Sequence, residues 1–210
     1  MEDILETYKR PYDPKKPLIG FDESNKQQIQ DVIESLPMKE GKPKRFESTY
    51  KRNGTRNLFM FFEPLAGKRR VKVTKRRTKQ DFAVCMKELV DEMYPSANKI
   101  VLVMDNLKTH HLGSLYETFS PVEAKRIAEK LEIHYTPKRG SWLNIAECEL
   151  SVLSRQCLKR RIGDSKKLNA EIQAWARGRN RESIKCDWQF TVEDARVKLK
   201  SLYPKWVRNI

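Results

Sequence analysis

The sequence predicts an α/β fold in which a mixed sheet of five strands carries helices on both faces. Two observations support this prediction. Three candidate strands come first along the chain and can form an antiparallel meander. Helices and strands then alternate, which is typical of a sheet built through crossover connections. The expected order is therefore strand, strand, strand, helix, strand, helix, strand, helix.

Apolar runs and alternation define the five strands. PLIGFDE (17–23) is an apolar strand that ends in two acids, and NLFMFFEPLAG (57–67) is a second apolar strand that ends in a turn. RRVKVTKRR (69–77) alternates in polarity, as expected of the antiparallel partner of that second strand. Ile100 to Met104 is an unbroken apolar run typical of a strand buried on both faces, and LEIHYTP (131–137) is a short fifth strand. Residues 24–56 lack sustained periodicity, and we expect a basic loop there.

Capping signals and apolar periodicity define the helices. Thr78 and Ser120 are candidate N-caps of helices over 78–95 and 120–131, and a long amphipathic helix is expected over 143–162. Further helices are expected near the N-terminus, over 165–179 and over 191–203. We therefore divide the chain into an N-terminal helix and linker (1–16), a main domain (17–162) and a C-terminal helical extension packed on it (163–210).

The charge of the chain points to a polyanionic partner. Lys and Arg number 43 against 28 Asp and Glu, a formal net charge of +15 on 210 residues. Such an excess favours nucleic acid, although a generic basic surface is the alternative. The four cysteines form no CxxC pair, which is typical of a reduced protein. No apolar run approaches the roughly 18 residues that span a membrane, and the first residues contain no signal core, so we expect a cytoplasmic protein.

Two aspartates follow apolar strand segments and are candidate metal ligands. Asp22 ends the first predicted strand, and Asp105 ends the most hydrophobic one. If these strands are neighbours, the two carboxylates lie side by side and repel each other unless a cation sits between them. Mg²⁺ prefers such oxygen ligands, and a third carboxylate would allow a two-metal site for displacement at phosphorus. The alternative is that each aspartate only caps a helix or closes a turn.

The helix predicted over 143–162 offers two glutamates as the third ligand. By helical angle, Glu147 lies among small residues, whereas Glu149 lies between the main apolar stripe and a second apolar group. Small neighbours suit a site beside bulky DNA and slightly favour Glu147. A capping role for Glu147 with Asn144 remains open, and so does the role of Glu149.

Three ordered blocks resemble the catalytic domain of mariner-superfamily transposases, in particular the bacterial insertion-sequence branch. They are FDE (21–23), VMDN with the following TH (103–110) and HYTPKRGSWLNIAE (134–147). The resemblance covers roughly residues 1–205. It implies a ribonuclease-H-like fold, an Asp-Asp-Glu triad, two Mg²⁺ or Mn²⁺ ions, and cut-and-paste DNA transposition, typically at TA dinucleotides.

Carried over to this chain, the resemblance assigns the catalytic and metal-binding roles to Asp22, Asp105 and Glu147. Five residues are expected to support the triad without binding metal: Glu23, Asn106, His110, Trp142 and Asn144. From the charge pattern we expect DNA contacts at Lys138, Arg139, Lys159, Arg160 and Arg161, with a solvated surface as the alternative.

The resemblance also implies partners. They are double-stranded DNA, both element ends and target, and a second copy of the chain in a homodimer on DNA. Family members usually carry an N-terminal helix-turn-helix region, so we expect a separate helix-turn-helix polypeptide, with the protein associated with the nucleoid. Two other functions remain open: a catalytically silent DNA-binding remnant, and a stand-alone ribonuclease-H-like nuclease.

Overall fold

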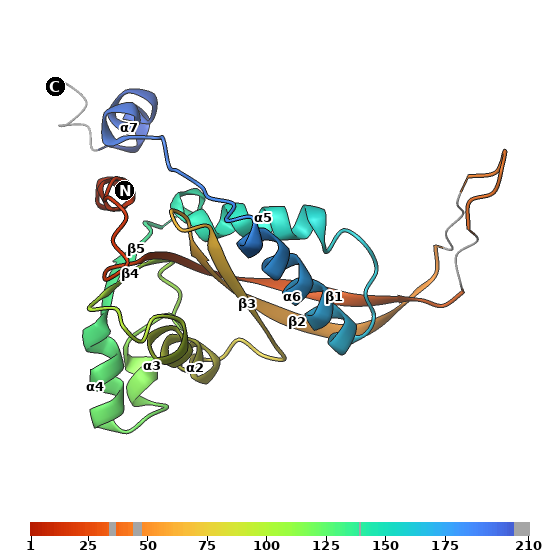
Figure 1. Cartoon of the computed structure of the whole chain (residues 1–210), viewed down its shortest axis with the longest axis horizontal. Helices are drawn as coiled ribbons and strands as arrows, with labels where there is room; N and C mark the ends of the chain where they lie inside the picture. Colours follow the sequence, from red (N-terminus) through yellow and green to blue (C-terminus); the bar gives the residue numbers. More distant parts are fainter. Residues whose placement is uncertain (34–36, 44–47, 139, 204–210) are drawn as a thin grey trace.

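The computed structural model describes all residues except 34–36, 44–47, 139 and 204–210. It contains a five-stranded sheet with helices on both faces (Figure 1). The strands are β1 (Leu18–Asp31), β2 (Tyr50–Glu63), β3 (Lys68–Thr74), β4 (Ile100–Met104) and β5 (Leu131–Tyr135). The α-helices are α1 (Glu2–Tyr8), α2 (Lys79–Glu88), α3 (Gly113–Tyr116), α4 (Pro121–Lys130), α5 (Ile145–Gln156), α6 (Ser165–Arg181) and α7 (Val192–Lys198). A π-helical turn, η1 (Leu89–Met93), extends α2, and two 3₁₀ turns, η2 (Ser141–Leu143) and η3 (Lys200–Leu202), precede α5 and follow α7.

The sheet has the order β3-β2-β1-β4-β5 and confirms the predicted mixed α/β class. The first three strands form the antiparallel meander, whereas β1, β4 and β5 pair in parallel. The hairpin between β2 and β3 closes through Gly67, which has a φ of 65° and so adopts a conformation that favours glycine. The first strand and the 100–104 strand are neighbours, because β1 pairs in parallel with β4.

Alternate side chains of β2 pack into two separate hydrophobic cores, one on each face of the sheet. Leu58, Met60 and Phe62 pack with residues of α1, α5, α6 and α7. Phe59 and Phe61 point the opposite way, into a core with α2, α3 and α4. The period of two in a strand produces this division, and each large buried side chain contributes about 1.5–3 kcal/mol.

The helix starts agree with the predicted caps. Thr78 and Asp81 form a reciprocal capping box on α2, and the Ser120 side chain accepts from the Glu123 N–H at the start of α4. The end of α5 differs from the prediction, because the helix stops at Gln156 rather than at 162. The chain leaves the helix there and returns Leu158 and Ile162 to the core.

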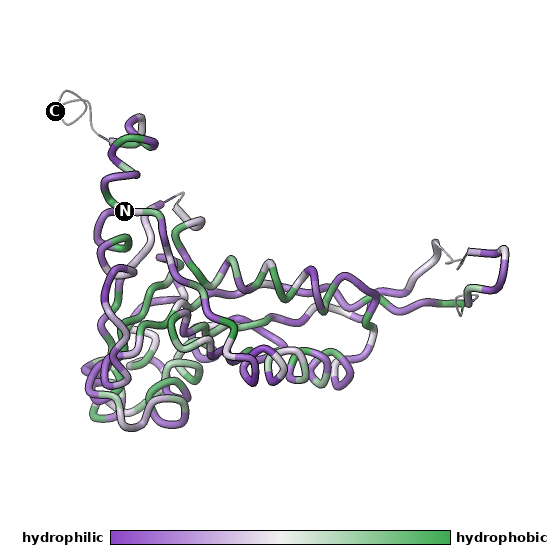
Figure 2. Tube along the Cα trace, turned by 45° about the horizontal axis from the view of Figure 1, so that its top comes forward, coloured by the Kyte–Doolittle hydropathy of each residue, from purple (hydrophilic) through white to green (hydrophobic). Residues whose placement is uncertain are grey.

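A long two-stranded arm replaces the loop predicted over residues 24–56. β1 continues to Asp31 and β2 begins at Tyr50, and the pair projects from the body of the protein (Figures 1 and 2). Its backbone pairing runs from Asn25↔Asn57 to Asp31↔Tyr50, with a register shift between Gln27 and Ile29. The prediction was wrong because most arm side chains are exposed or half-buried, so backbone pairing occurs without an apolar alternation.

The C-terminal helices pack on the same face as α1 and α5. α6 lies against β3, and α7 lies beside α1, where Arg196 pairs with Glu2 at 2.8 Å. No described helix is long and apolar enough to cross a membrane.

Candidate catalytic site

Asp22 lies inside β1, and the expectation that it ends the first strand was wrong. The strand continues because its other neighbour, β2, pairs with it well beyond this point, with Asp22 opposite Met60. On the β4 side the register is Gly20↔Val103, so Asp22 and Asp105 each lie two residues beyond the last parallel pair. The two aspartates therefore lie at the same level of the sheet, where β4 ends and β1 continues.

Gly20 allows helix α5 to approach β1 next to Asp22. A Cβ atom at this position would lie 2.6 Å from the Ile145 side chain and 3.0 Å from the Ala146 nitrogen. Because Ile145 and Ala146 form the first turn of α5, only glycine permits this close packing. The contact places the start of α5 over the strand that carries the first candidate ligand.

Asn144 connects the start of α5 to Asp22. Its buried side-chain amide donates to the Phe21 carbonyl at 2.8 Å and to the Asp22 carboxylate at 3.2 Å. Its side-chain oxygen accepts from the Ala146 N–H at 3.1 Å and so caps the helix. Asn144 therefore supports the site in a definite way: it orients Asp22 and fixes the helix that carries Glu147.

Glu147 faces Asp22 across an open hollow. The Glu147 hollow has a volume of about 320 Å³ and is lined by Asp22, Glu23, Ser24, Glu147, Leu150, Ser151 and Ser154. Two of the small neighbours expected from the helical angles, Ser151 and Ser154, are among these residues. Within the described part of the chain, the Glu147 carboxylate has no hydrogen bond or ion pair, and the capping box with Asn144 is not formed. The carboxylate is thus free to bind a ligand in the hollow.

Burial and nearby acids disfavour the charged form of Asp22. Burial raises the pKa of Asp22 to about 7, and the charges of Asp105, Glu147 and Glu23 add to the effect. The N–H of Glu23 donates to the Asp22 carboxylate and acts in the opposite direction without cancelling it. Asp22, Asp105 and Glu147 come from three different segments and act on one another electrostatically.

The buried His110 side chain lies between the carboxylates of Asp105 and Glu23. Its imidazole is 1% exposed, with Nδ1 2.5 Å from Asp105 and Nε2 against Glu23. Burial alone would lower the pKa of His110, but the hydrogen bonds to Asp105 and Glu23 outweigh it and raise the pKa to about 9. The ring is therefore an imidazolium at neutral pH and holds one oxygen of Asp105 in place.

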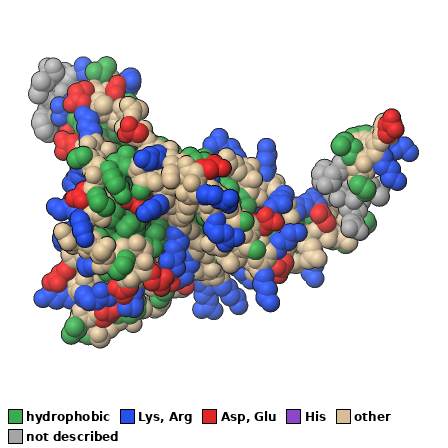
Figure 3. All heavy atoms as spheres, viewed as in Figure 1, with side chains coloured by type: hydrophobic (Ala, Val, Ile, Leu, Met, Phe, Trp, Pro, Cys, Tyr) green, Lys and Arg blue, Asp and Glu red, His purple; other side chains and the backbone are tan. Residues whose placement is uncertain are grey.

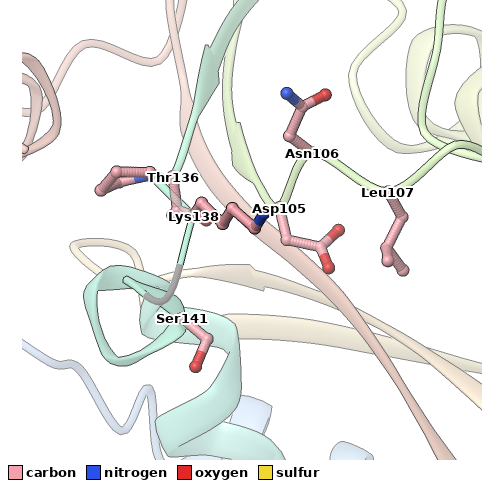
Figure 4. A pocket seen from close by; sticks show the side chains of 7 residues that line it. Asp105, Asn106, Leu107, Thr136, Lys138 and Ser141 are labelled. Carbon is pink, nitrogen blue, oxygen red and sulfur yellow. The ribbon is translucent and has the colours of Figure 1, made fainter.

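Asp105 lines a second hollow. The Asp105 hollow, about 340 Å³, is lined by Asp105, Asn106, Leu107, Thr136, Pro137, Lys138 and Ser141 (Figure 4). Lys138 thereby gives this hollow a positive charge, which suits a phosphate group. Among the predicted supporting residues, Asn106 lines the hollow and Trp142 lies next to it on η2, 40% exposed and edge-on to Phe190.

The donor set suits a hard divalent cation, although the side chains do not converge on one point. Among the described residues, no group of three acidic, His or Cys side chains is close enough to hold one ion as placed. Asp22 and Glu147 line one hollow, and Asp105 lines another. Burial and the neighbouring carboxylates raise the pKa of Asp22, and carboxylate oxygens are the type of ligand that Mg²⁺ and Mn²⁺ bind. The residues present therefore fit such ions.

Glu149 lies in a buried ion-pair cluster on the other side of α5. Its carboxylate, 5% exposed, forms an ion pair with Arg69, with 2.8 Å between Oε1 and Nε, and accepts a hydrogen bond from Arg179 Nε at 2.8 Å. Arg69 also donates to the Ile184 carbonyl at 2.6 Å and to the Asn180 side chain at 3.2 Å. The cluster fastens α5 to β3 and to the end of α6, so Glu149 has a structural role.

Only part of the predicted basic surface lies near the acids. Lys138 lines the Asp105 hollow, and Arg139 falls outside the described residues. Lys159, Arg160 and Arg161 are exposed after α5, where Arg160 pairs with Glu171 at 2.5 Å and Arg161 pairs with Asp31 of the arm at 2.6 Å. Lys and Arg side chains are spread over the body and the arm on the face shown in Figure 3.

Sequence reasoning missed Arg69, Arg179 and Tyr8, which hold α5 in place. A signal existed for Arg69, because it shares the inward face of its alternating strand with Val71 and Val73. A buried arginine is stable only when an acid neutralises its charge. Glu149, whose role the sequence left open, is the acid that pairs with Arg69. Tyr8, in the N-terminal helix, carried no such signal.

The comparisons with known proteins agree with this architecture. A family model described as "DDE superfamily endonuclease" matches residues 17–169. Among solved structures, the chain is similar to the Mos1 mariner paired-end complex with Mn, with a TM-score of 0.58 and 13% identity over 87% of this chain and 55% of that one. It is also similar to the Mos1 transposase paired-end complex with the left transposon end, with a TM-score of 0.57 and 13% identity over the same shares. No sequence among the curated proteins matches at a significant level.

At this identity the structural similarity establishes a common fold, which is ribonuclease-H-like. The expected fold is therefore confirmed. The chain spans about 55% of the length of the two solved structures.

Proposed function

Since the chain belongs to the DDE superfamily endonuclease family, we infer that its carboxylate cluster cuts DNA strands and joins the cut ends to new DNA, as a transposase does. The observation that carries this proposal is the electrostatic coupling of Asp22 to Asp105 and Glu147 near the point where β4 ends and β1 continues. Three acids from separate segments act on one another there, and Glu147 has no protein cation as partner within the described residues. Such an arrangement favours external cations and a polyanionic substrate.

In this proposal, Asp22, Asp105 and Glu147 hold two divalent ions, Mg²⁺ or Mn²⁺. Ions of this kind activate a hydroxyl for attack on phosphorus and stabilise the leaving oxygen. His110 keeps the Asp105 carboxylate oriented, and Asn144 does the same for Asp22. Lys138 offers its ammonium group to a DNA phosphate beside Asp105.

The proposed partners are double-stranded DNA and a second copy of the chain. The excess of basic residues and the spread of Lys and Arg over the surface support DNA as the substrate. The two similar solved structures are described as paired-end complexes, one of them with a transposon end. By analogy we propose that two copies assemble on two element ends and insert them at a TA target.

A nicking and strand-transfer assay tests this proposal. A labelled duplex carrying the inverted repeats that flank the gene is incubated with the protein, a supercoiled target plasmid and MnCl₂ or MgCl₂. The wild-type protein is expected to nick the duplex and to transfer the label to the plasmid. Asp105→Ala and Glu147→Ala are each expected to lower both rates about 100-fold or more. Glu117→Ala removes an exposed acid that pairs with Lys79 and lines neither hollow, and it serves as the control.

The outcomes also separate the alternative functions. DNA binding without metal-dependent nicking would favour a silent remnant, and cleavage of an RNA–DNA hybrid without strand transfer would favour a ribonuclease-H-like nuclease. Nicking that survives both substitutions would overturn the triad assignment.

A further inference from the structure

The side chain of Tyr8, in helix α1, contacts the turn that precedes α5. Tyr8, the last residue of α1, is 5% exposed, and its ring stacks on Trp188 with 4.9 Å between centroids. Its hydroxyl donates to the Leu143 carbonyl at 2.7 Å and accepts from the Ile145 N–H at 3.0 Å. One hydroxyl thus binds the residues on both sides of Asn144.

These two hydrogen bonds satisfy groups that have difficulty finding other partners. The Ile145 N–H is the first amide of α5, and the first amides of a helix have no acceptor within the helix. Leu143 and Ile145 are both fully buried, so water does not replace the hydroxyl. Burial raises the pKa of Tyr8, which keeps the hydroxyl neutral and able both to donate and to accept.

The segment that Tyr8 holds also positions two of the three acids. Asn144 orients Asp22 through its amide and caps α5 through its oxygen, and Glu147 follows one turn later on α5. A displacement of this turn would move the Asp22 contact and the Glu147 carboxylate together. Errors of about 1 Å in such a site are enough to lower a reaction rate by up to about 100-fold.

We propose that Tyr8 is a positioning residue of the catalytic site: its hydroxyl fixes the turn around Asn144 and thereby sets Glu147 against Asp22. It touches neither the substrate nor the acids themselves. The effect on DNA cleavage rests on the proposed function, whereas the effect on the turn does not. The alternative is that Tyr8 contributes only to core packing through its ring.

Tyr8→Phe separates these two roles, because it keeps the ring and its stacking on Trp188 and removes only the hydroxyl. Tyr94→Phe is the matched control. The Tyr94 hydroxyl donates to Glu63 at 2.8 Å, and its ring packs against the core on the opposite face of the sheet. Each variant loses a largely buried hydroxyl, and each is expected to melt about 2–4 °C below the wild type.

Amide hydrogen exchange, resolved by NMR without metal or DNA, tests the turn directly. The Ile145 amide loses its acceptor in any case, so the informative amides are those of Ala146 and Glu147, which donate to the Asn144 side chain and backbone. Tyr8→Phe is expected to speed their exchange about tenfold relative to Tyr94→Phe. Equal exchange in the two variants would overturn the proposal.

Cleavage kinetics then test the consequence for the site. Tyr8→Phe is expected to lower the Mn²⁺-dependent nicking rate about tenfold and to raise the Mn²⁺ concentration at half-maximal rate, with Tyr94→Phe unchanged in both. Nicking by Tyr8→Phe within twofold of that by Tyr94→Phe, at a similar melting temperature, would contradict a positioning role. If the wild type does not nick DNA, the proposed function fails, and the exchange rates still decide the role of Tyr8.

Discussion

Glu147 and Glu149 stand two residues apart on α5 in opposite electrostatic surroundings. Glu149 is buried against Arg69 and Arg179, and Arg69 also binds a backbone and a side-chain group of the C-terminal segment. Glu147 faces a hollow that it shares with Asp22 and Glu23, and no cation of the described chain pairs with it. A carboxylate neutralised within the protein holds the fold together, whereas a carboxylate placed among other carboxylates is available for an ion from outside. Substitutions at the two positions and the addition of metal test whether the two glutamates differ in this way.

The largest effect is expected from Glu149→Ala. The substitution leaves the guanidinium groups of Arg69 and Arg179 without their buried counterion, so the free energy of unfolding should fall by about 3–5 kcal/mol. Urea unfolding followed by circular dichroism measures this change. Glu147→Ala is the control on the same helix and should change the unfolding free energy by less than about 0.5 kcal/mol. Similar losses in the two variants would remove the distinction between the glutamates.

A smaller effect is expected from divalent metal. Binding of Mn²⁺ to the folded state alone stabilises it by about 2.7 kcal/mol at a concentration 100 times the dissociation constant. Unfolding with and without MnCl₂ should show this gain for the wild type and a much smaller one for Glu147→Gln. Glu117→Gln should keep the full gain. Stabilisation that persists in Glu147→Gln would place the ion elsewhere.

The smallest effect is expected from Glu147→Gln in the absence of metal. Removing one negative charge near Asp22 relieves repulsion, so the variant should be as stable as the wild type or more stable by up to about 1 kcal/mol. Thermal unfolding in a chelating buffer measures this difference, with Glu149→Gln expected to change stability in the opposite direction. A loss above 1 kcal/mol in Glu147→Gln would reveal a structural role for Glu147.

Features of the fold that depend on local signals could be predicted from the sequence, whereas features that depend on backbone pairing alone could not. Local signals were sufficient for the helix starts at Thr78 and Ser120, the buried strand Ile100–Met104 and the meander of the first three strands. The arm was not predictable from periodicity, because its strands pair through the backbone while most of their side chains face solvent. The position of Asp22 inside β1 was missed for the same reason.

For the candidate site, motif order and helical angles singled out Asp22, Asp105 and Glu147, but the contacts around these residues are tertiary. The angle of Glu149 showed a buried flank without showing that Arg69 and Arg179 occupy it. His110 was expected to support the site, yet its place between Asp105 and Glu23 depends on how the loop after β4 folds back. No local pattern links Tyr8 to residues more than 130 positions later.

Because β1 continues beyond the end of β4, Asp22 and Asp105 are held in place in different ways. The residues directly before and after Asp22 in β1 are part of a stretch that pairs with β2. Asp105, in contrast, follows the last residue of β4 and begins a loop. Backbone pairing fixes Asp22 within the sheet, whereas Asp105 is held through its side chain by His110. We therefore expect a change at the site to displace Asp105 and the loop that follows it more readily than Asp22.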